Sequence, residues 1–166
     1  MHCEVCAFRN PKATVAGVFI QNNAILLLKR NEGPFQGQWD FPSGYVNEGE
    51  TSDIAVVREM KEELGIDVHP LLIKEFPGFG FWKEFSFPTL THVYLCDFGE
   101  QEIKLNQENS DFKWVPLKDL GPNEIHWEFN ENLCDWLKQK FTLDLEGISQ
   151  GNTIDEQSLY KKILNH

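Results

Sequence analysis

The feature that most constrains the fold is the stretch at residues 51–64, TSDIAVVREMKEEL, because its residues sort onto two faces of a helix. Each helical residue advances about 100° around the axis, so positions three and four apart share a face. An apolar stripe is formed by Ile54, Val56, Val57, Met60 and Leu64. Glu59, Glu62 and Glu63 share a separate arc of roughly 100°. The helix therefore buries one side and presents three carboxylates on another.

The three carboxylates repel one another at this spacing, which weakens a helix by about 0.2–0.5 kcal/mol per pair. They also stand near the helix C-terminus, where the macrodipole disfavours negative charge. A bound divalent cation is the simplest compensation, because Mg²⁺ prefers oxygen ligands and keeps positions open for water and phosphate. The triplet alone is more typical of a solvated acidic face, so the surrounding residues have to decide.

The ends of this helix are marked by residues with strong positional preferences. Thr51 or Ser52 can cap its N-terminus, and Asp53 suits the first turn. Gly65 follows the last apolar residue and is the expected helix-ending position, with positive φ.

The size and charge of the chain limit the classes of protein to which it can belong. Its 166 residues suit one domain, and 41% hydrophobic residues indicate a globular protein. The formal net charge of −11 argues against general nucleic-acid binding, which depends on Lys and Arg. A small anionic substrate is compatible with this charge if a metal ion supplies positive charge locally. No apolar run approaches the roughly 20 residues of a membrane span, and we expect a cytoplasmic protein with no membrane partner.

Strands and helices are predicted to alternate irregularly, which indicates a mixed α/β fold with helices against a mixed sheet. Residues 13–28 predict two strands around a turn at Gln21–Asn23, where asparagine tolerates positive φ. The remaining expected elements are strands at 71–76, 90–98 and 112–115, an aromatic loop at 77–89, and a helix at 122–141. We divide the chain into a short N-terminal segment (1–12), one domain (13–141) and a tail (142–166) that we expect to be a short packed helix.

The residues around the acidic helix follow a longer pattern. From Gly44 the chain fits G-x5-E-x7-R-E-U-x-E-E-x-G-U, where U is a bulky aliphatic residue. The fixed positions are Gly44, Glu50, Arg58, Glu59, Glu62, Glu63 and Gly65, with Met60 and Ile66 as the U residues. At about 6% usage each, seven fixed residues make a chance match on the order of 10⁻⁶ or rarer. The segment resembles the Nudix box, and roughly residues 10–140 resemble a Nudix hydrolase.

This resemblance implies an α/β/α sandwich that hydrolyses a nucleoside diphosphate linked to another moiety, with Mg²⁺ or Mn²⁺ as cofactor. It implies that Glu59 and Glu63 are the principal metal ligands and Glu62 a third ligand or outer partner. The backbone carbonyl of Gly44 is a further ligand in many relatives, and glycine lets the main chain approach the ion.

Two further roles in the box follow from the resemblance together with side-chain chemistry. Arg58 is expected to pair with Glu50 and so to orient the metal ligands, and we expect this pair and Gly65 to be structural. The general base is sought among Glu62, Glu63, Glu108 and Asp111, with the first two favoured. For Glu108 and Asp111 the favoured interpretation is ordinary loop charge before a strand.

Outside the box, several residues are candidates for substrate binding. Lys29 and Arg30 end a predicted strand where a basic residue of relatives can reach a phosphate, or they form an exposed pair. Trp39 stands just before the box and is a candidate for either substrate contact or core packing. Candidates for stacking on a base are Phe79, Phe81 and Trp82 of the aromatic loop, which equally suit a hydrophobic lid or a dimer contact.

The substrate itself stays open at this stage. The markers of ADP-ribose, NADH, coenzyme A and dinucleoside polyphosphate hydrolases are missing after the box, so no subfamily is assigned. Nucleoside triphosphates, nucleotide sugars and ADP-ribose-like compounds remain candidates. The alternative is a catalytically silent Nudix-fold module, which typically loses box carboxylates, whereas this chain keeps every one. A homodimer is compatible with the sequence.

The cysteines carry a weaker signal. Cys3 and Cys6 have metal-ligand spacing, but a four-ligand zinc site needs two more ligands, and no second Cys-x-x-Cys follows. Two interpretations stay open. One is a zinc site completed by His2, another cysteine or a second subunit, and the other, which we favour, is a pair of reduced thiols. Cys96 lies in an apolar run and is expected in the core.

Overall fold

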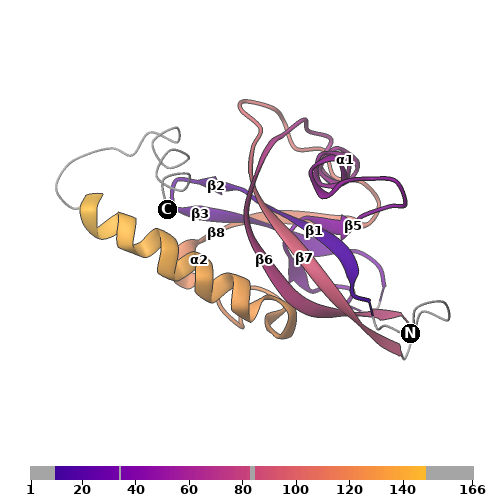
Figure 1. Cartoon of the computed structure of the whole chain (residues 1–166). Coiled ribbons are helices and arrows are strands. Elements are labelled where there is room, and N and C mark those ends of the chain that lie inside the picture. The colour runs from indigo at the N-terminus through magenta and orange to yellow at the C-terminus, as the bar shows by residue number, and fades with distance from the viewer. Residues whose placement is uncertain (1–9, 34, 83–84, 149–166) are drawn as a thin grey trace.

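The computed structural model describes residues 10–33, 35–82 and 85–148. Figure 1 shows the strands gathered between the two α-helices of these residues. The elements in chain order are β1 (Lys12–Val18), β2 (Ile20–Gln21), β3 (Ala24–Arg30), β4 (Trp39–Asp40), β5 (Ser43–Tyr45), α1 (Ser52–Leu64), β6 (His69–Trp82), β7 (Phe85–Asp97), β8 (Asn109–Pro116), the short 3-10 helix η1 (Leu117–Asp119) and α2 (Trp127–Ile148). No helix of the described residues has the length and apolar character that a membrane crossing requires.

The strands form two four-stranded sheets. The first has the order β5-β1-β7-β6, and in it β1 runs parallel to β7 while the other pairs are antiparallel. The second is centred on β3, which pairs with β2, β4 and β8, all antiparallel. The first sheet is thus mixed, as predicted.

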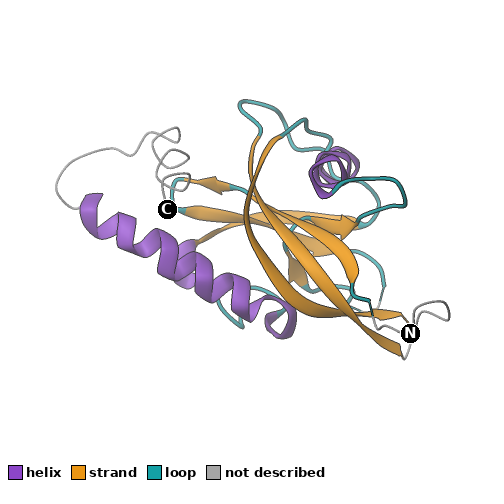
Figure 2. Cartoon of the chain, viewed as in Figure 1, coloured by secondary structure: helices purple, strands orange, loops and turns teal. Residues whose placement is uncertain are grey.

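Alternating residues of the central strands divide the core into two clusters, one under each helix. Ala16 and Val18 of β1 pack in the cluster of α2, while Val15 packs in the cluster of α1. The same alternation runs along β3 from Ile25 to Leu28. The helices therefore lie on opposite sides of the strands, as Figure 2 shows, and the predicted α/β/α sandwich is confirmed.

The predicted hairpin at residues 13–28 is partly wrong. Asn22 and Asn23 do form the turn, with φ of 49° and 60°, but the turn joins β2 to β3 and not β1 to β3. Both edges of β1 are already taken by β5 and β7, so β3 has no edge of β1 to pair with. The chain passes from one sheet to the other at the fully buried Phe19.

The predicted aromatic loop at residues 77–89 is also wrong, because β6 continues to Trp82 and β7 begins at Phe85. Glycine was the misleading signal. A Cβ on Gly80 would stand 2.7 Å from the Phe87 ring, so this glycine makes room for a cross-strand aromatic side chain instead of forming a turn.

The second helix is displaced from its predicted position at 122–141. Residues 121–126 form a turn in which the N–H groups of Glu124 and Ile125 bond to the Gly121 carbonyl. The His126 N–H donates to Trp39 O at 2.9 Å, so the backbone just before the helix is hydrogen-bonded to β4. At its other end α2 continues past Phe141 to Ile148, where no proline interrupts it. Most of the predicted tail lies outside the described residues, as do Cys3 and Cys6.

Candidate active site

Helix α1 is seated by its apolar stripe, and this decides where its carboxylates point. Val56, Met60 and Leu64 are fully buried, whereas Ile54 is 56% exposed and does not belong to the buried face, contrary to the wheel. Gly65 ends the helix with φ of 69°, and its N–H donates to Lys61 O at 3.1 Å. With these contacts the helix turns Glu59 and Glu63 toward the β5 strand.

Arg58 is the centre of a network of five hydrogen bonds. Its Nε and Nη2 donate to the two carboxylate oxygens of Glu50 at 2.8 and 3.0 Å, which is the two-pronged pair expected from the sequence. Nη2 also donates to Tyr45 O, and Nη1 donates to Glu59 Oε1 at 2.7 Å and Glu62 Oε2 at 3.1 Å. These hydrogen bonds lower the pKa of Glu50 to about 2 and raise that of Arg58. One guanidinium thus joins the loop before α1 to two of the three glutamates.

Glu63 is the most enclosed of the three carboxylates, with 8% of the residue exposed. Its Oε2 accepts the Ser43 N–H at 3.0 Å, and its Oε1 accepts from Asn109 Nδ2 at 3.4 Å. Burial raises the pKa of Glu63 to about 8, and the nearby charge of Glu59 adds to the effect. Burial likewise raises the pKa of Glu59. Two half-buried or buried acids thus stand together at the start of β5.

The β5 backbone reaches these acids closely because position 44 has no side chain. A Cβ on Gly44 would stand 2.0 Å from Glu59 Cδ, well inside van der Waals contact. Gly44 does not have a positive φ, so the reason for glycine at this position is the lack of space for a side chain and not the backbone conformation. Gly44 is consequently in close contact with Glu59, and the residue before it, Ser43, holds Glu63.

This donor set suits a hard divalent cation. Within the described ranges, no group of three or more His, Cys, Asp and Glu side chains already converges as a metal site. Glu59 and Glu62 are turned to Arg58, and Glu63 is turned to Ser43. All of these candidates offer oxygen, however, and a cation would relieve the mutual repulsion of Glu59 and Glu63.

The acids open into a cavity of about 840 Å³ between α1, the strands and the start of α2. Glu59, Glu62, Glu63 and Glu108 are among its lining residues. Of the described residues that line it, Arg30 is the single lysine or arginine. A cavity of this volume is in the range of small-ligand sites, about 300–1,000 Å³.

Only some of the candidates for substrate binding line the cavity. Arg30 and Phe79 line it, whereas Lys29, Trp39 and Phe81 do not. The Trp39 ring is covered by Lys113 Nζ at 4.5 Å and Lys29 Nζ at 5.8 Å. These contacts account for both Lys29 and Trp39 as packing residues of the second sheet.

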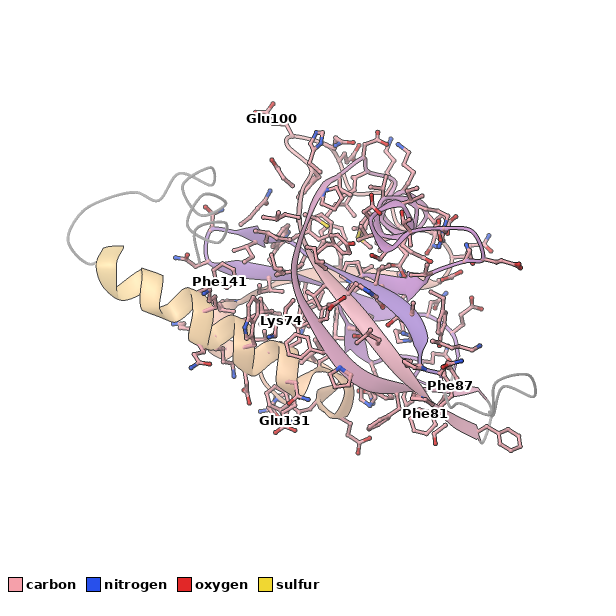
Figure 3. All side chains as sticks on the ribbon, in the orientation of Figure 1. Lys74, Phe81, Phe87, Glu100, Glu131 and Phe141 are labelled. Atoms are coloured by element: carbon pink, nitrogen blue, oxygen red, sulfur yellow. The ribbon has the colours of Figure 1, made fainter. Side chains whose placement is uncertain are left out.

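The aromatic candidates of the hairpin divide in the same way. Phe81 packs edge-on against Phe79 and Phe129, with ring centroids 6.4 and 5.8 Å apart. Figure 3 shows Phe81 and Phe87 toward the far end of the β6–β7 hairpin. The Trp82 side chain lies outside the described residues. Phe79 is therefore the one stacking candidate whose described side chain faces the cavity.

The two downstream candidates for the general base also separate. Glu108 lines the cavity. Asp111 belongs to β8, where it pairs with Lys29 and its Oδ1 accepts the Phe112 N–H, and it does not line the cavity. Of the four candidates for the general base, Glu62, Glu63 and Glu108 therefore line the cavity and Asp111 does not.

Sequence reasoning missed two polar residues of the cavity, Asp40 and Asn130. Asn130 Nδ2 donates to Asp40 Oδ1 at 3.0 Å, although the residues are 90 positions apart. Each has a recognisable feature in the sequence. Asp40 is an acid between two aromatic residues, and Asn130 interrupts the apolar face of the predicted second helix. Buried polar residues of this kind need partners, which only the fold reveals.

Comparison with known proteins agrees with this geometry. A family model, the NUDIX domain, matches residues 11–137. The nucleoside triphosphatase NudI of Escherichia coli is 30% identical over 149 residues, covering 81% of this chain and 96% of NudI. A Caenorhabditis elegans protein described as nudix hydrolase 1 is 30% identical over 124 residues, but this chain spans only 32% of its length. The crystal structure of a MutT NUDIX hydrolase from Burkholderia pseudomallei superposes with a TM-score of 0.59 and 27% identity, covering 68% of this chain and 88% of that one.

Proposed function

The chain belongs to the NUDIX domain family, and from this premise we propose that it hydrolyses the diphosphate linkage of a nucleotide with the help of a divalent metal ion. The observation that carries the proposal is that Glu59, Glu63 and the Gly44 backbone line one cavity, with Glu59 against Gly44 and Glu63 bound to the neighbouring Ser43 N–H. A surface charge cluster would need no such enclosure. Burial disfavours the charged form of Glu63, and a bound cation would offset that cost.

In this proposal Glu59 and Glu63 hold the ion together with the Gly44 carbonyl, and Glu62 is a third ligand or holds a bound water. When bound, Mg²⁺ or Mn²⁺ supplies positive charge to the phosphate oxygens and lowers the pKa of a bound water. The Arg58–Glu50 pair orients the helix and its loop. Ser43 holds the Glu63 carboxylate through its backbone N–H.

The reaction is attack by a water molecule on one phosphorus of the diphosphate. A carboxylate of the chain accepts the proton, and Glu62 and Glu63 are the candidates for this base. They differ in their surroundings, because Ser43 and Asn109 enclose Glu63, whereas the Glu62 side chain is 55% exposed and accepts a hydrogen bond from Arg58.

Nucleoside triphosphates are the substrate class that we propose first. NudI is a nucleoside triphosphatase, and the match to it extends over nearly its whole length. Nucleotide sugars and ADP-ribose-like compounds come second. Each of these classes carries a diphosphate attached to a nucleoside, which is the linkage that the proposed reaction cleaves.

The test is release of phosphate, diphosphate and nucleotide across a panel of these compounds, with and without Mg²⁺ or Mn²⁺. Glu63→Gln is expected to lose nearly all metal-dependent activity while circular dichroism shows an unchanged fold. Glu48→Gln is the matched control, because Glu48 is an exposed carboxylate of the loop between β5 and α1 and does not line the cavity. Wild-type turnover by the Glu63 variant would refute the ligand assignment.

The alternative function is a catalytically silent nucleotide-binding module. Metal and nucleotide binding without cleavage of any compound in the panel would favour it. The complete set of box carboxylates favours the enzyme.

A further inference from the structure

The segment that leads into β8 is bound to the C-terminal end of α1. The Lys104 N–H donates to Leu64 O at 2.8 Å, and the Asn106 N–H donates to Glu63 O at 3.2 Å. The last carbonyl groups of a helix have no partner within the helix, so these two N–H groups satisfy two of them. The contacts also bring Asn109, the first residue of β8, beside Glu63.

A bulge at the start of β8 turns the Asn109 side chain toward the cavity. Lys29 of β3 pairs with Asp111. The next residue of β3, Arg30, pairs with Asn109, which leaves Ser110 as the extra residue of the bulge. Side chains alternate along a regular strand, so without the bulge Asn109 would share a face with Asp111, which does not line the cavity. With the bulge Asn109 stands opposite Arg30, and both of these residues line the cavity.

A chain of hydrogen bonds fixes which end of the Asn109 amide meets Glu63. The Glu108 N–H donates to the side chain of Asn106 at 3.0 Å. A backbone N–H can only donate, so Asn106 presents its oxygen, Oδ1, to this bond. The Asn109 amide lies 3.4 Å from the same oxygen and therefore presents its nitrogen, Nδ2. This nitrogen also lies 3.4 Å from Glu63 Oε1, so Glu63 is the acceptor of the last bond in the chain.

The second oxygen of Glu63 has a donor of its own. Its Oε2 accepts the Ser43 N–H at 3.0 Å, whereas Oε1 accepts the longer bond from Asn109. Two donors on different oxygens restrict the rotation of a carboxylate in a way that one donor cannot. Glu63 and Asn109 are each 8% exposed, so little water competes for these hydrogen bonds. The carboxylate is therefore oriented by protein groups from two strands, β5 and β8.

We propose that Asn109 is a positioning residue for Glu63, and that its amide nitrogen holds the carboxylate in the orientation that binds the divalent ion. The inference rests on the proposed function for the presence of the ion, but it concerns ion binding and not hydrolysis. Glu59 and Glu62 accept hydrogen bonds from Arg58 instead. The arginine of the box thus orients two of the three glutamates, and Asn109, from outside the box, orients the third.

The test is equilibrium binding of Mn²⁺ without nucleotide, followed by the electron paramagnetic resonance signal of the free ion. Asn109→Leu removes the amide and keeps a side chain of similar size. The Kd for Mn²⁺ should rise about tenfold, the lower end of the range for a partner of a metal ligand, because the bond to Glu63 is long at 3.4 Å. Asn109→Ala removes the same amide without added apolar atoms and should have the same effect, so a folding defect in one variant leaves the other to decide.

Asn132→Leu is the matched control, because Asn132 is an exposed asparagine that lines the same cavity from α2. It makes the same chemical change and should leave the affinity for Mn²⁺ unaltered. A double variant tests whether Asn109 acts through Glu63. Adding Asn109→Leu to Glu63→Gln should not weaken Mn²⁺ binding further, because the carboxylate that Asn109 orients is already absent. A general loosening of the fold would weaken binding in both backgrounds.

Wild-type affinity for Mn²⁺ in a folded Asn109→Leu or Asn109→Ala protein would overturn the inference, and so would a further loss of affinity in the double variant. Neither result would bear on the proposed function, which hydrolysis by the wild-type protein decides separately. A wild-type protein that neither binds Mn²⁺ nor hydrolyses any nucleotide would refute the proposed function and the inference together.

Discussion

Replacing Gly44 by alanine should reduce catalytic activity much more than it reduces stability. The added Cβ would stand 2.0 Å from Glu59 Cδ and 2.1 Å from Glu59 Oε1. An ordinary contact begins near 3.4 Å, so the carboxylate has to retreat by about 1.4 Å. Since the obstacle is the end of a flexible side chain and not backbone, the fold can accommodate the change.

The cost in stability is set by what the retreat breaks. Glu59 Oε1 accepts from Arg58 Nη1 at 2.7 Å, and a shift of this size removes that hydrogen bond. We expect the free energy of unfolding to fall by about 1.5–3 kcal/mol, the range for a hydrogen bond to a charged group. The cost in activity should be larger, because displacing a reacting group by about 1 Å can reduce the rate about 100-fold.

The assay combines urea denaturation with kcat/KM and with a Mn²⁺ titration of the same variant. Gly121→Ala is the control, because its Cβ would meet nothing nearer than Asp119 O at 3.8 Å and its φ is not positive. It should change neither stability nor activity by a comparable amount. A Gly44→Ala protein with wild-type kcat/KM and Mn²⁺ affinity would refute the placement of Glu59 at the reacting end of the cavity.

Three further predictions test the surroundings of the site. Arg58→Lys should lower kcat/KM by about 10–100-fold, since lysine cannot make the two-pronged bond to Glu50, and steady-state kinetics measures this; unchanged kinetics would show that charge alone suffices. The pKa of Glu50 is depressed to about 2 in the folded protein, so its contribution to stability is present above the unfolded pKa near 4.5 and is lost as pH falls toward 2. Thermal unfolding at pH 7 and pH 3 should therefore show a smaller acid loss in Glu50→Gln than in the wild-type protein, and an equal loss would contradict the pairing. Burial raises the pKa of Cys96 and Cys134 to about 12, so iodoacetamide should label neither thiol at pH 8 until the protein unfolds, as peptide mass spectrometry can determine. Rapid labelling of either cysteine in the folded protein would show that the core opens there.

The elements predicted correctly are those whose signal is local. The α1 helix depends on a periodic apolar stripe and on Gly65, both contained in one short segment. The Asn22–Asn23 turn likewise depends on residues that tolerate positive φ. The aromatic segment at 77–89 was misassigned because its glycines face Phe87 and Thr89 of the paired strand, and sequence gives no sign of that partner.

The features of the candidate site likewise divide into those that depend on local sequence and those that depend on tertiary packing. The spacing of Glu59, Glu62 and Glu63 on one helix face can be calculated from helix geometry, and the box pattern assigns the family. The enclosure of Glu63 by Ser43 and Asn109 cannot be calculated in this way, because it depends on β5 and β8 packing against the helix. Its raised pKa follows from that enclosure and not from the charge pattern.

The sequence by itself determined the acidic helix, its ends and the chemistry of its oxygen ligands, because these depend on residues within one or two turns of each other. Only the tertiary structure decided which other side chains meet the ligand cavity. Asp40 and Asn130 are 90 positions apart and have no common pattern, yet the fold places the first turns of α2 beside β4, where the Asn130 amide lies 3.0 Å from Asp40 Oδ1. Contacts between distant segments depend on how whole elements pack, and local periodicity contains no information about that packing.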